Sequence, residues 1–124
     1  MPNRQTVQAF IHLVEQGRYV EAIEQFYAPD ASMQENSQPP RQGRDTLVAY
    51  EKAVMAACSA MRTLPVESFL VDGDFVVIHW VFEFTRHSGK TLRIDELAHQ
   101  RWEGDRIVEE RFFYDPIAAQ SEPG

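Results

Sequence analysis

Cysteine is almost absent from the 124-residue chain, which contains only Cys58. No disulfide can form within it, which is typical of proteins in a reducing compartment. One cysteine also cannot supply the cysteine pairs of a zinc-binding motif. No apolar run approaches the roughly 18 residues needed to cross a bilayer, and the segment Met1–Thr6 lacks the apolar stretch of a signal peptide. We therefore expect a cytoplasmic protein with no membrane partner.

Basic residues are few: 12 Lys and Arg face 19 Asp and Glu, for a formal charge of −7. Nucleic acids and anionic membranes attract proteins with a basic surface, so neither is expected as a partner. The sequence contains neither a Walker phosphate-binding loop nor the GxGxxG motif of dinucleotide-binding proteins. The length fits one domain, which we expect at residues 1–118, followed by a flexible tail at residues 119–124.

Aromatic residues, in contrast, are abundant: eight Phe, four Tyr and two Trp. These side chains are bulkier than a thin two-layer fold requires. The surplus indicates either a deep pocket or a buried subunit interface.

Three helices are indicated in the first half of the chain. Apolar spacing of i, i+3, i+4 and i+7 predicts a first helix that ends near Gly17, and a second over residues 19–26 that Pro29 terminates. A third helix is expected from about Arg44 to Met61. The apolar faces of the three are, in order, Val7, Phe10, Ile11 and Val14; Tyr19, Ala22, Ile23 and Phe26; and Leu47, Tyr50, Val54, Ala57 and Met61.

The second half is typical of an antiparallel sheet. The turn Asp72-Gly73 lies between two apolar runs and predicts a hairpin, and further turns are indicated at His87–Gly89 and Glu103–Asp105. Strands are expected at about residues 65–71, 74–86, 90–102 and 106–115, after a short strand at residues 31–35. The fold class is therefore α+β, with the helices packed on one face of a long, bent sheet.

Alternation along the strands assigns side chains to two faces. Ile78, Trp80, Phe82 and Phe84 share an apolar face that must meet the helices. If Trp102 and Phe112 share that face, it also includes four polar side chains, Glu96, Gln100, Glu110 and Tyr114. Ile107 then points outward. An apolar hollow with a few converging polar groups is typical of a small-molecule site.

The opposite face carries Val77, His79, Val81 and Glu83 and is half apolar, so we expect it to be covered. A second copy of the chain would cover it and form a homodimer through the outer sheet face. A long loop or the tail lying over that face is the alternative.

The segments Phe26–Asn36, Pro40–Gly43 and Gly104–Pro116, with the order of the elements, resemble the SnoaL-like branch of the nuclear transport factor 2-like superfamily. The resemblance covers roughly residues 5–116. It implies a cone, in which a curved antiparallel sheet is wrapped by about three N-terminal helices around an internal pocket. The superfamily includes polyketide cyclases, steroid isomerases, dehydratases and non-catalytic binding domains, so the fold alone does not decide the function.

The resemblance also offers positions for comparison with the steroid isomerases. Their general base falls on Glu35, which is still a carboxylate. The two hydrogen-bond donors of their oxyanion hole fall on Phe10 and Ala98, neither of which can donate. Without these donors, steroid isomerisation is not expected.

The polyketide cyclases imply proton abstraction beside a carbonyl group by one buried carboxylate, with no cofactor. Glu35 and Glu110 are our candidate catalytic residues. The candidate ligand-binding residues are Tyr27, Tyr50, Trp80, Phe82, Glu96, Gln100, Trp102, Phe112 and Tyr114. No metal site is expected, because Glu96 and His99 are three apart on a strand and face opposite sides.

We therefore expect a pocket for a small hydrophobic or aromatic molecule, used by a cofactor-independent cyclase, isomerase or dehydratase. Two alternatives stay open. The same pocket could serve a non-catalytic binding or sensing domain, or the cone could be filled and the chain act as a dimeric interaction module. Arg41, in the loop before the third helix, is expected either to meet an acidic substrate group or to pair with a nearby carboxylate.

Overall fold

The computed structural model describes residues 1–116, so the expected domain end at residue 118 and the tail at 119–124 lie outside the described residues. Helices α1 (Arg4–Glu15), α2 (Tyr19–Phe26) and α3 (Arg44–Ala56) come from the first half of the chain. The strands are β1 (Tyr27–Glu35), β2 (Arg41–Gln42), β3 (Cys58–Thr63), β4 (Phe69–Asp72), β5 (Phe75–Arg86), β6 (Thr91–Glu103) and β7 (Arg106–Phe113).

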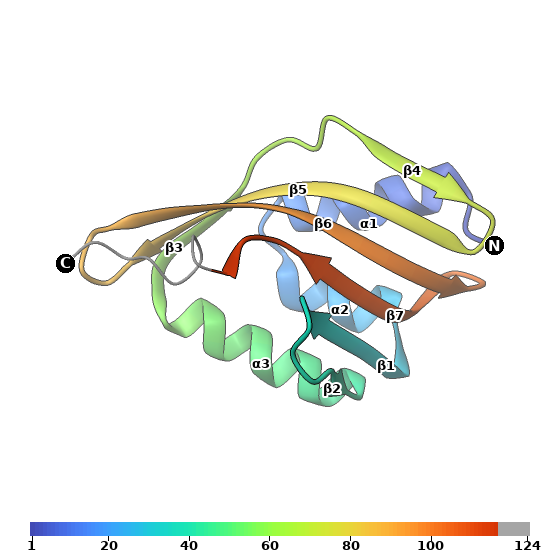
Figure 1. The fold of residues 1–124 in the computed structure, drawn as a ribbon, viewed down its shortest axis with the longest axis horizontal. Helices are drawn as coiled ribbons and strands as arrows, with labels where there is room; N and C mark the ends of the chain where they lie inside the picture. The colour runs from blue at the N-terminus through green and yellow to red at the C-terminus, as the bar shows by residue number, and fades with distance from the viewer. Residues whose placement is uncertain (117–124) are drawn as a thin grey trace.

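One curled sheet contains all the strands, in the order β2-β1-β7-β6-β5-β3, with β4 also paired to β5. Figure 1 shows the long strands β5 and β6 arching over the molecule, with α2 and α3 below them. The cone expected from the resemblance is confirmed. The sheet is mixed, however, and not antiparallel throughout, because β1 pairs with β7 in parallel.

Helix α1 forms where the apolar spacing predicts it. The side chain of Asn3 accepts a hydrogen bond from the Thr6 amide at 2.8 Å and so caps its first turn. Gly17 follows the helix with φ of 79°, a conformation that residues with a β-carbon rarely adopt. The buried side chains of α1 are the four predicted from the sequence. No helix within residues 1–116 is long and apolar enough to span a bilayer.

The prediction that the third helix reaches Met61 was wrong, because α3 ends at Ala56 and β3 follows at once. Alanine and methionine favour a helix locally, but β3 pairs with the outer end of β5, from Thr63 opposite Phe82 to Cys58 opposite Arg86. These contacts satisfy backbone groups at the edge of the longest hairpin, and tertiary pairing overrides the weak helical propensity.

The first strand is also longer than predicted, since β1 starts directly after α2, at Tyr27. This places Tyr27 on the sheet, opposite Ile107 of β7. Its ring is buried, with only 3% of its surface exposed.

The assignment of Ile107 to the outer face was wrong. Trp102 pairs with Ile107, but the preceding residue of β6, Arg101, pairs with Glu109, so Val108 is an extra residue in β7. Such a β-bulge shifts the alternation of one strand by one residue. Ile107 is therefore completely buried, while Glu110 also points inward.

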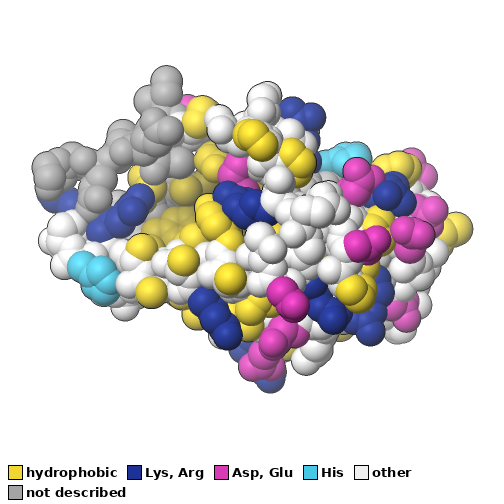
Figure 2. Space-filling view, turned by 90° about the horizontal axis from the view of Figure 1, so that it is seen from below, with side chains coloured by type: hydrophobic (Ala, Val, Ile, Leu, Met, Phe, Trp, Pro, Cys, Tyr) yellow, Lys and Arg dark blue, Asp and Glu magenta, His cyan; other side chains and the backbone are white. Residues whose placement is uncertain are grey.

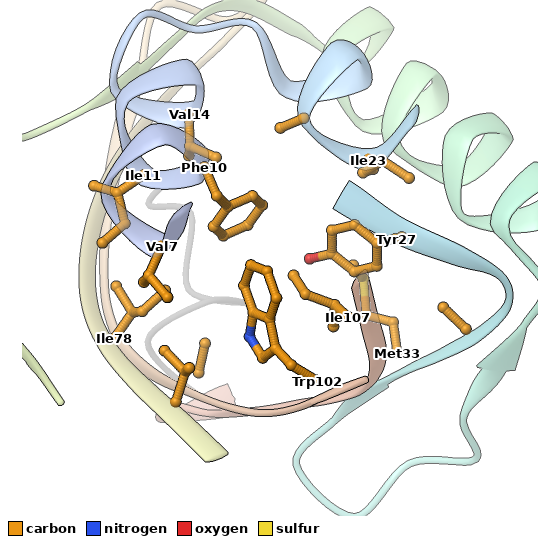
Figure 3. Close-up of a cluster of buried hydrophobic side chains, with 14 of the residues drawn as sticks. Val7, Phe10, Ile11, Val14, Ile23, Tyr27, Met33, Ile78, Trp102 and Ile107 are labelled. Carbon is orange, nitrogen blue, oxygen red and sulfur yellow. The ribbon is translucent and has the colours of Figure 1, made fainter. Parts of the chain in front are cut away.

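The core lies at the closed end of the curl, where α1 packs against the sheet. Figure 3 shows Phe10, Tyr27 and Trp102 facing one another inside it. The Phe10 ring makes edge contacts with Tyr27 at 6.0 Å, Trp80 at 6.1 Å and Trp102 at 6.2 Å between centroids. Aromatic side chains thus seal one end of the cone.

Candidate functional site

A cavity of about 350 Å³ opens beyond this aromatic end, between the curled sheet and the three helices. A volume above about 300 Å³ is typical of small-molecule sites, so the cone is not filled. In Figure 2, hydrophobic side chains line a hollow on this side of the molecule. The lining includes all four tyrosines of the chain, Tyr19, Tyr27, Tyr50 and Tyr114, and four carboxylates, Glu35, Glu51, Glu96 and Glu110.

The pairing of the strands decides how far each polar group lies from the closed end of the cavity. Glu110 is opposite Gln100, Glu35 is opposite Phe112, and Glu96 is opposite Trp80. The carboxylates on the sheet therefore occupy successive levels from the closed end toward the open end, and Glu51 faces them from α3.

Glu110 belongs to a buried hydrogen-bond chain at the closed end. The Trp102 indole donates to Gln100 Oε1 at 2.9 Å, and Gln100 Nε2 donates to Glu110 Oε2 at 2.6 Å. The Tyr27 hydroxyl donates to Glu110 Oε1. Burial, partly offset by these two hydrogen bonds, raises the pKa of Glu110 to about 7. Gln100 and Trp102 do not line the cavity, but they hold Glu110 in its wall.

Glu35 is held by Arg41 through an ion pair of 2.7 Å, with both side chains about three-quarters buried or more. The Arg41 guanidinium also stacks on the Tyr50 ring at 3.4 Å from its centroid. Arg41 thus pairs with a nearby carboxylate, as one of the two alternatives predicts. The Arg41 pair fixes the position of Glu35 on one side of the cavity.

Glu51 and Glu96 differ from these two carboxylates, because within residues 1–116 neither forms a hydrogen bond or an ion pair. Burial, with repulsion from Glu35, raises the pKa of Glu51 to about 7. Burial, with repulsion from Glu35 and Glu110, raises the pKa of Glu96 well above its usual value. Glu51 is therefore suited to exchange protons with a ligand near neutral pH, and Glu96 keeps its proton to a higher pH than an exposed glutamate does.

Sequence reasoning missed Glu51 because a charged residue on a helix normally faces solvent. The signal was its spacing: Glu51 is four residues after Leu47 and three before Val54, so it shares their inward face. A carboxylate in an apolar helical stripe is a recognisable sign of a buried polar site.

Most of the predicted ligand-binding residues line the cavity: Tyr27, Tyr50, Trp80, Phe82, Glu96, Phe112 and Tyr114. Burial and the nearby Glu35 raise the pKa of Tyr114 to about 12, so its hydroxyl keeps its proton. Phe10 lines the closed end and Ala98 is fully buried. Neither side chain can donate a hydrogen bond, and their match to the steroid-isomerase donor positions stays a prediction.

Cys58 gives a direct test of occupancy, because the chain's only thiol lines the cavity and is half-buried. A bound ligand is expected to block thiol reagents. At a ligand concentration 100 times its Kd, modification should slow by about 100-fold, measured by the release of a coloured thiol leaving group. An equal rate with and without saturating ligand would show that ligands bind elsewhere; the rate in urea serves as the control.

Comparison with known proteins places this geometry in a family. Residues 7–110 match the SnoaL-like domain. A candidate SnoaL-like polyketide cyclase from Mesorhizobium loti is 22% identical, with a TM-score of 0.76 over 92% of this chain and all of the other. Another from Jannaschia sp. CCS1 is 17% identical, with a TM-score of 0.79 over 96% and 94%.

A third similar structure is TerC, co-crystallised with polyporic acid, at 19% identity and a TM-score of 0.80 over 96% of this chain and 95% of TerC. No curated protein matches the sequence. At these identities the solved structures establish the fold alone. The match over residues 7–110, together with the cone and its cavity, shows that the chain belongs to the SnoaL-like domain family.

Proposed function

We propose that the protein is a cofactor-independent acid–base enzyme acting on a small hydrophobic carbonyl compound. One observation carries the proposal: in an aromatic cavity of about 350 Å³, Glu51 and Glu96 form no hydrogen bond or ion pair within residues 1–116 and have raised pKa values. A purely structural carboxylate would be paired, because an unpaired buried carboxyl group costs stability.

The two carboxyl groups suit different roles. Glu51, with a pKa of about 7, is ionised in a substantial fraction of molecules at neutral pH and would remove a proton beside the carbonyl. Burial, with repulsion from three neighbouring carboxylates, raises the pKa of Glu96 and so favours its protonated form, and the role proposed for Glu96 is to deliver that proton. Glu35 and Glu110, the candidates from the sequence, stay predictions; both already hold hydrogen bonds within the protein.

The charge of the cavity restricts its ligand. Four carboxylates line one small space together with the cation Arg86, and Arg41 beside it is already paired with Glu35. The excess of carboxylates would repel a ligand carboxylate or phosphate in a poorly solvated site. Aromatic walls favour a flat, neutral molecule, which agrees with the class of compound that the proposal names.

Proton abstraction can be measured without the natural substrate. In deuterium oxide, the protein should accelerate deuterium incorporation beside the carbonyl of β-tetralone or methyl naphthyl ketone, followed by mass spectrometry. Heat-denatured protein and buffer alone give the background. If both ketones bind but exchange no faster than in buffer, the cavity is a binding site without this chemistry.

We also propose that the protein is a homodimer formed through the outer sheet face. Leu97 and Phe113 are paired neighbours on that face, with 47% and 44% of their surfaces exposed, and Leu70 and Phe75 are exposed on adjacent strands. Clustered exposed apolar side chains are typical of an interface. Analytical ultracentrifugation at micromolar concentration should show a dimer, and Leu97→Glu should dissociate it; a wild-type monomer would contradict the proposal.

A further inference from the structure

We propose that the Tyr27 hydroxyl is the group that contacts the ligand's carbonyl oxygen, and that protonation of Glu110 turns this hydroxyl from a donor to Glu110 into a donor to the ligand. The inference rests on the proposed use of the cavity for carbonyl compounds. It adds a ligand-binding hydroxyl whose hydrogen-bonding direction is controlled by a buried neighbour.

The buried chain fixes which oxygen of Glu110 can carry a proton. An indole N–H can only donate, so the contact with Trp102 makes Oε1 of Gln100 the acceptor and directs its Nε2 toward Glu110. Nε2 also can only donate, so Oε2 of Glu110 accepts in every state. A proton on Glu110 therefore resides on Oε1, the oxygen beside Tyr27.

The direction of the Tyr27 hydrogen bond follows from that proton. When Glu110 is ionised, the single hydroxyl proton of Tyr27 is used by Oε1, and no donor faces the ligand at this level. When Oε1 carries the proton, it donates to the Tyr27 oxygen. The Tyr27 proton is then released and can rotate about the C–O bond toward the cavity, which Tyr27 lines.

The position of Tyr27 suits this role. Its hydroxyl oxygen points toward the interior of the curl, near Phe10 and Trp102 (Figure 3). Within residues 1–116 the only hydrogen bond of this hydroxyl is the one to Glu110. Burial and the neighbouring Glu110 raise the pKa of Tyr27 well above its usual value, so the hydroxyl keeps its proton.

Other charged groups also face Glu110: Glu35 from β1, Glu96 from β6 and Glu51 from α3. Glu51 titrates in the same range as Glu110, near pH 7. Any test must therefore separate the two, and variants of each residue do so.

The experiment compares two probes of the same shape, methyl naphthyl ketone and ethylnaphthalene, by calorimetric titration between about pH 5.5 and pH 8.5. The ketone should bind about tenfold more weakly at pH 8 than at pH 6, because the fraction of protonated Glu110 falls above its pKa of about 7. Ethylnaphthalene, which cannot accept a hydrogen bond, should show no such dependence.

Three variants complete the test. Glu110→Gln mimics the protonated acid, since its amide can donate to Tyr27 and accept from Gln100, and it should bind the ketone tightly at every pH. Tyr27→Phe should lose both the preference for the ketone and its pH dependence. Glu51→Gln should keep the tenfold change in ketone affinity, with its midpoint shifted to lower pH.

The control is Tyr19→Phe, which removes a cavity hydroxyl that is hydrogen-bonded to Thr63 at 2.9 Å. This variant should keep both the preference for the ketone and its pH dependence.

Infrared spectroscopy of the bound ketone gives an independent measurement. Its carbonyl stretch should move to lower frequency below pH 7 in the wild type and at every pH in Glu110→Gln, but not in Tyr27→Phe. A shift that persists in Tyr27→Phe, or a pH dependence that disappears in Glu51→Gln, would overturn the proposal. If both probes bind with the same pH profile, the proposed switch of the Tyr27 hydroxyl is wrong, while the proposed use of the cavity stands. If neither probe binds, both the switch and the proposed use of the cavity are wrong.

Discussion

Replacing Glu51 with glutamine is expected to lower the rate of deuterium exchange by about 10²–10⁴-fold, the usual contribution of a general base. Glutamine has nearly the same shape but cannot accept a proton at neutral pH. In the wild type the rate should pass through a maximum near pH 7, because Glu51 acts in its ionised form, the proposed Tyr27 donor needs Glu110 protonated, and both carboxyl groups have pKa values of about 7. The rise on the acidic side of this maximum should disappear in Glu51→Gln. Mass spectrometry of the ketone over time measures both effects.

Two glutamine variants make the result specific. Glu24→Gln removes a carboxylate from the exposed side of α2 and should exchange at the wild-type rate. Glu35→Gln tests the base predicted from the sequence. If Glu35→Gln loses exchange while Glu51→Gln keeps it, the base is Glu35 and not Glu51. Circular dichroism and thermal melting of each variant confirm that the fold is retained.

Replacing Trp102 with alanine is expected to lower the free energy of unfolding by about 3–5 kcal/mol. The side chain is completely buried, packs against the rings of Phe10 and Phe26 at 6.2 and 6.3 Å, and donates to Gln100. Alanine leaves a cavity at the closed end and removes the donor that orients Gln100. Urea unfolding followed by circular dichroism measures the change.

The matched variant Trp102→Phe separates the packing from the hydrogen bond. Phenylalanine retains much of the apolar volume, so we expect a loss clearly smaller than for alanine. Its ring cannot donate to Gln100, whose amide would then be free to turn over and present its oxygen to Glu110. An alanine variant that unfolds at nearly the wild-type urea concentration would show that Trp102 is not part of the core.

Local patterns were sufficient for much of the fold. Helix α1 has one regular apolar stripe, so its four buried residues could be named from spacing alone. Alternation along β5 and β6 placed Trp80, Phe82 and Glu96 on the cavity side in the same way. In both cases a single residue's position along its own element decides its environment.

The failures share a different cause, because each depends on a contact between segments distant in the sequence. Residues 58–63 form β3 only because the end of β5 lies beside them. Ile107 is buried because its pairing with Trp102 places an extra residue in β7. The role proposed for Glu51 depends on the depth of the cavity opposite α3, which no local pattern reports.

The extra residue of β7 has an evolutionary consequence. Val108 alone separates the register that buries Ile107 from the register that brings Glu110 and Phe112 into the cavity. Because Val108 is the surplus residue, deleting it would leave Glu109 opposite Arg101 and Glu110 opposite Gln100, so the carboxylate that Tyr27 and Gln100 hold would still point inward. A single codon could thus be lost at this position without changing which side chains of β7 face the cavity.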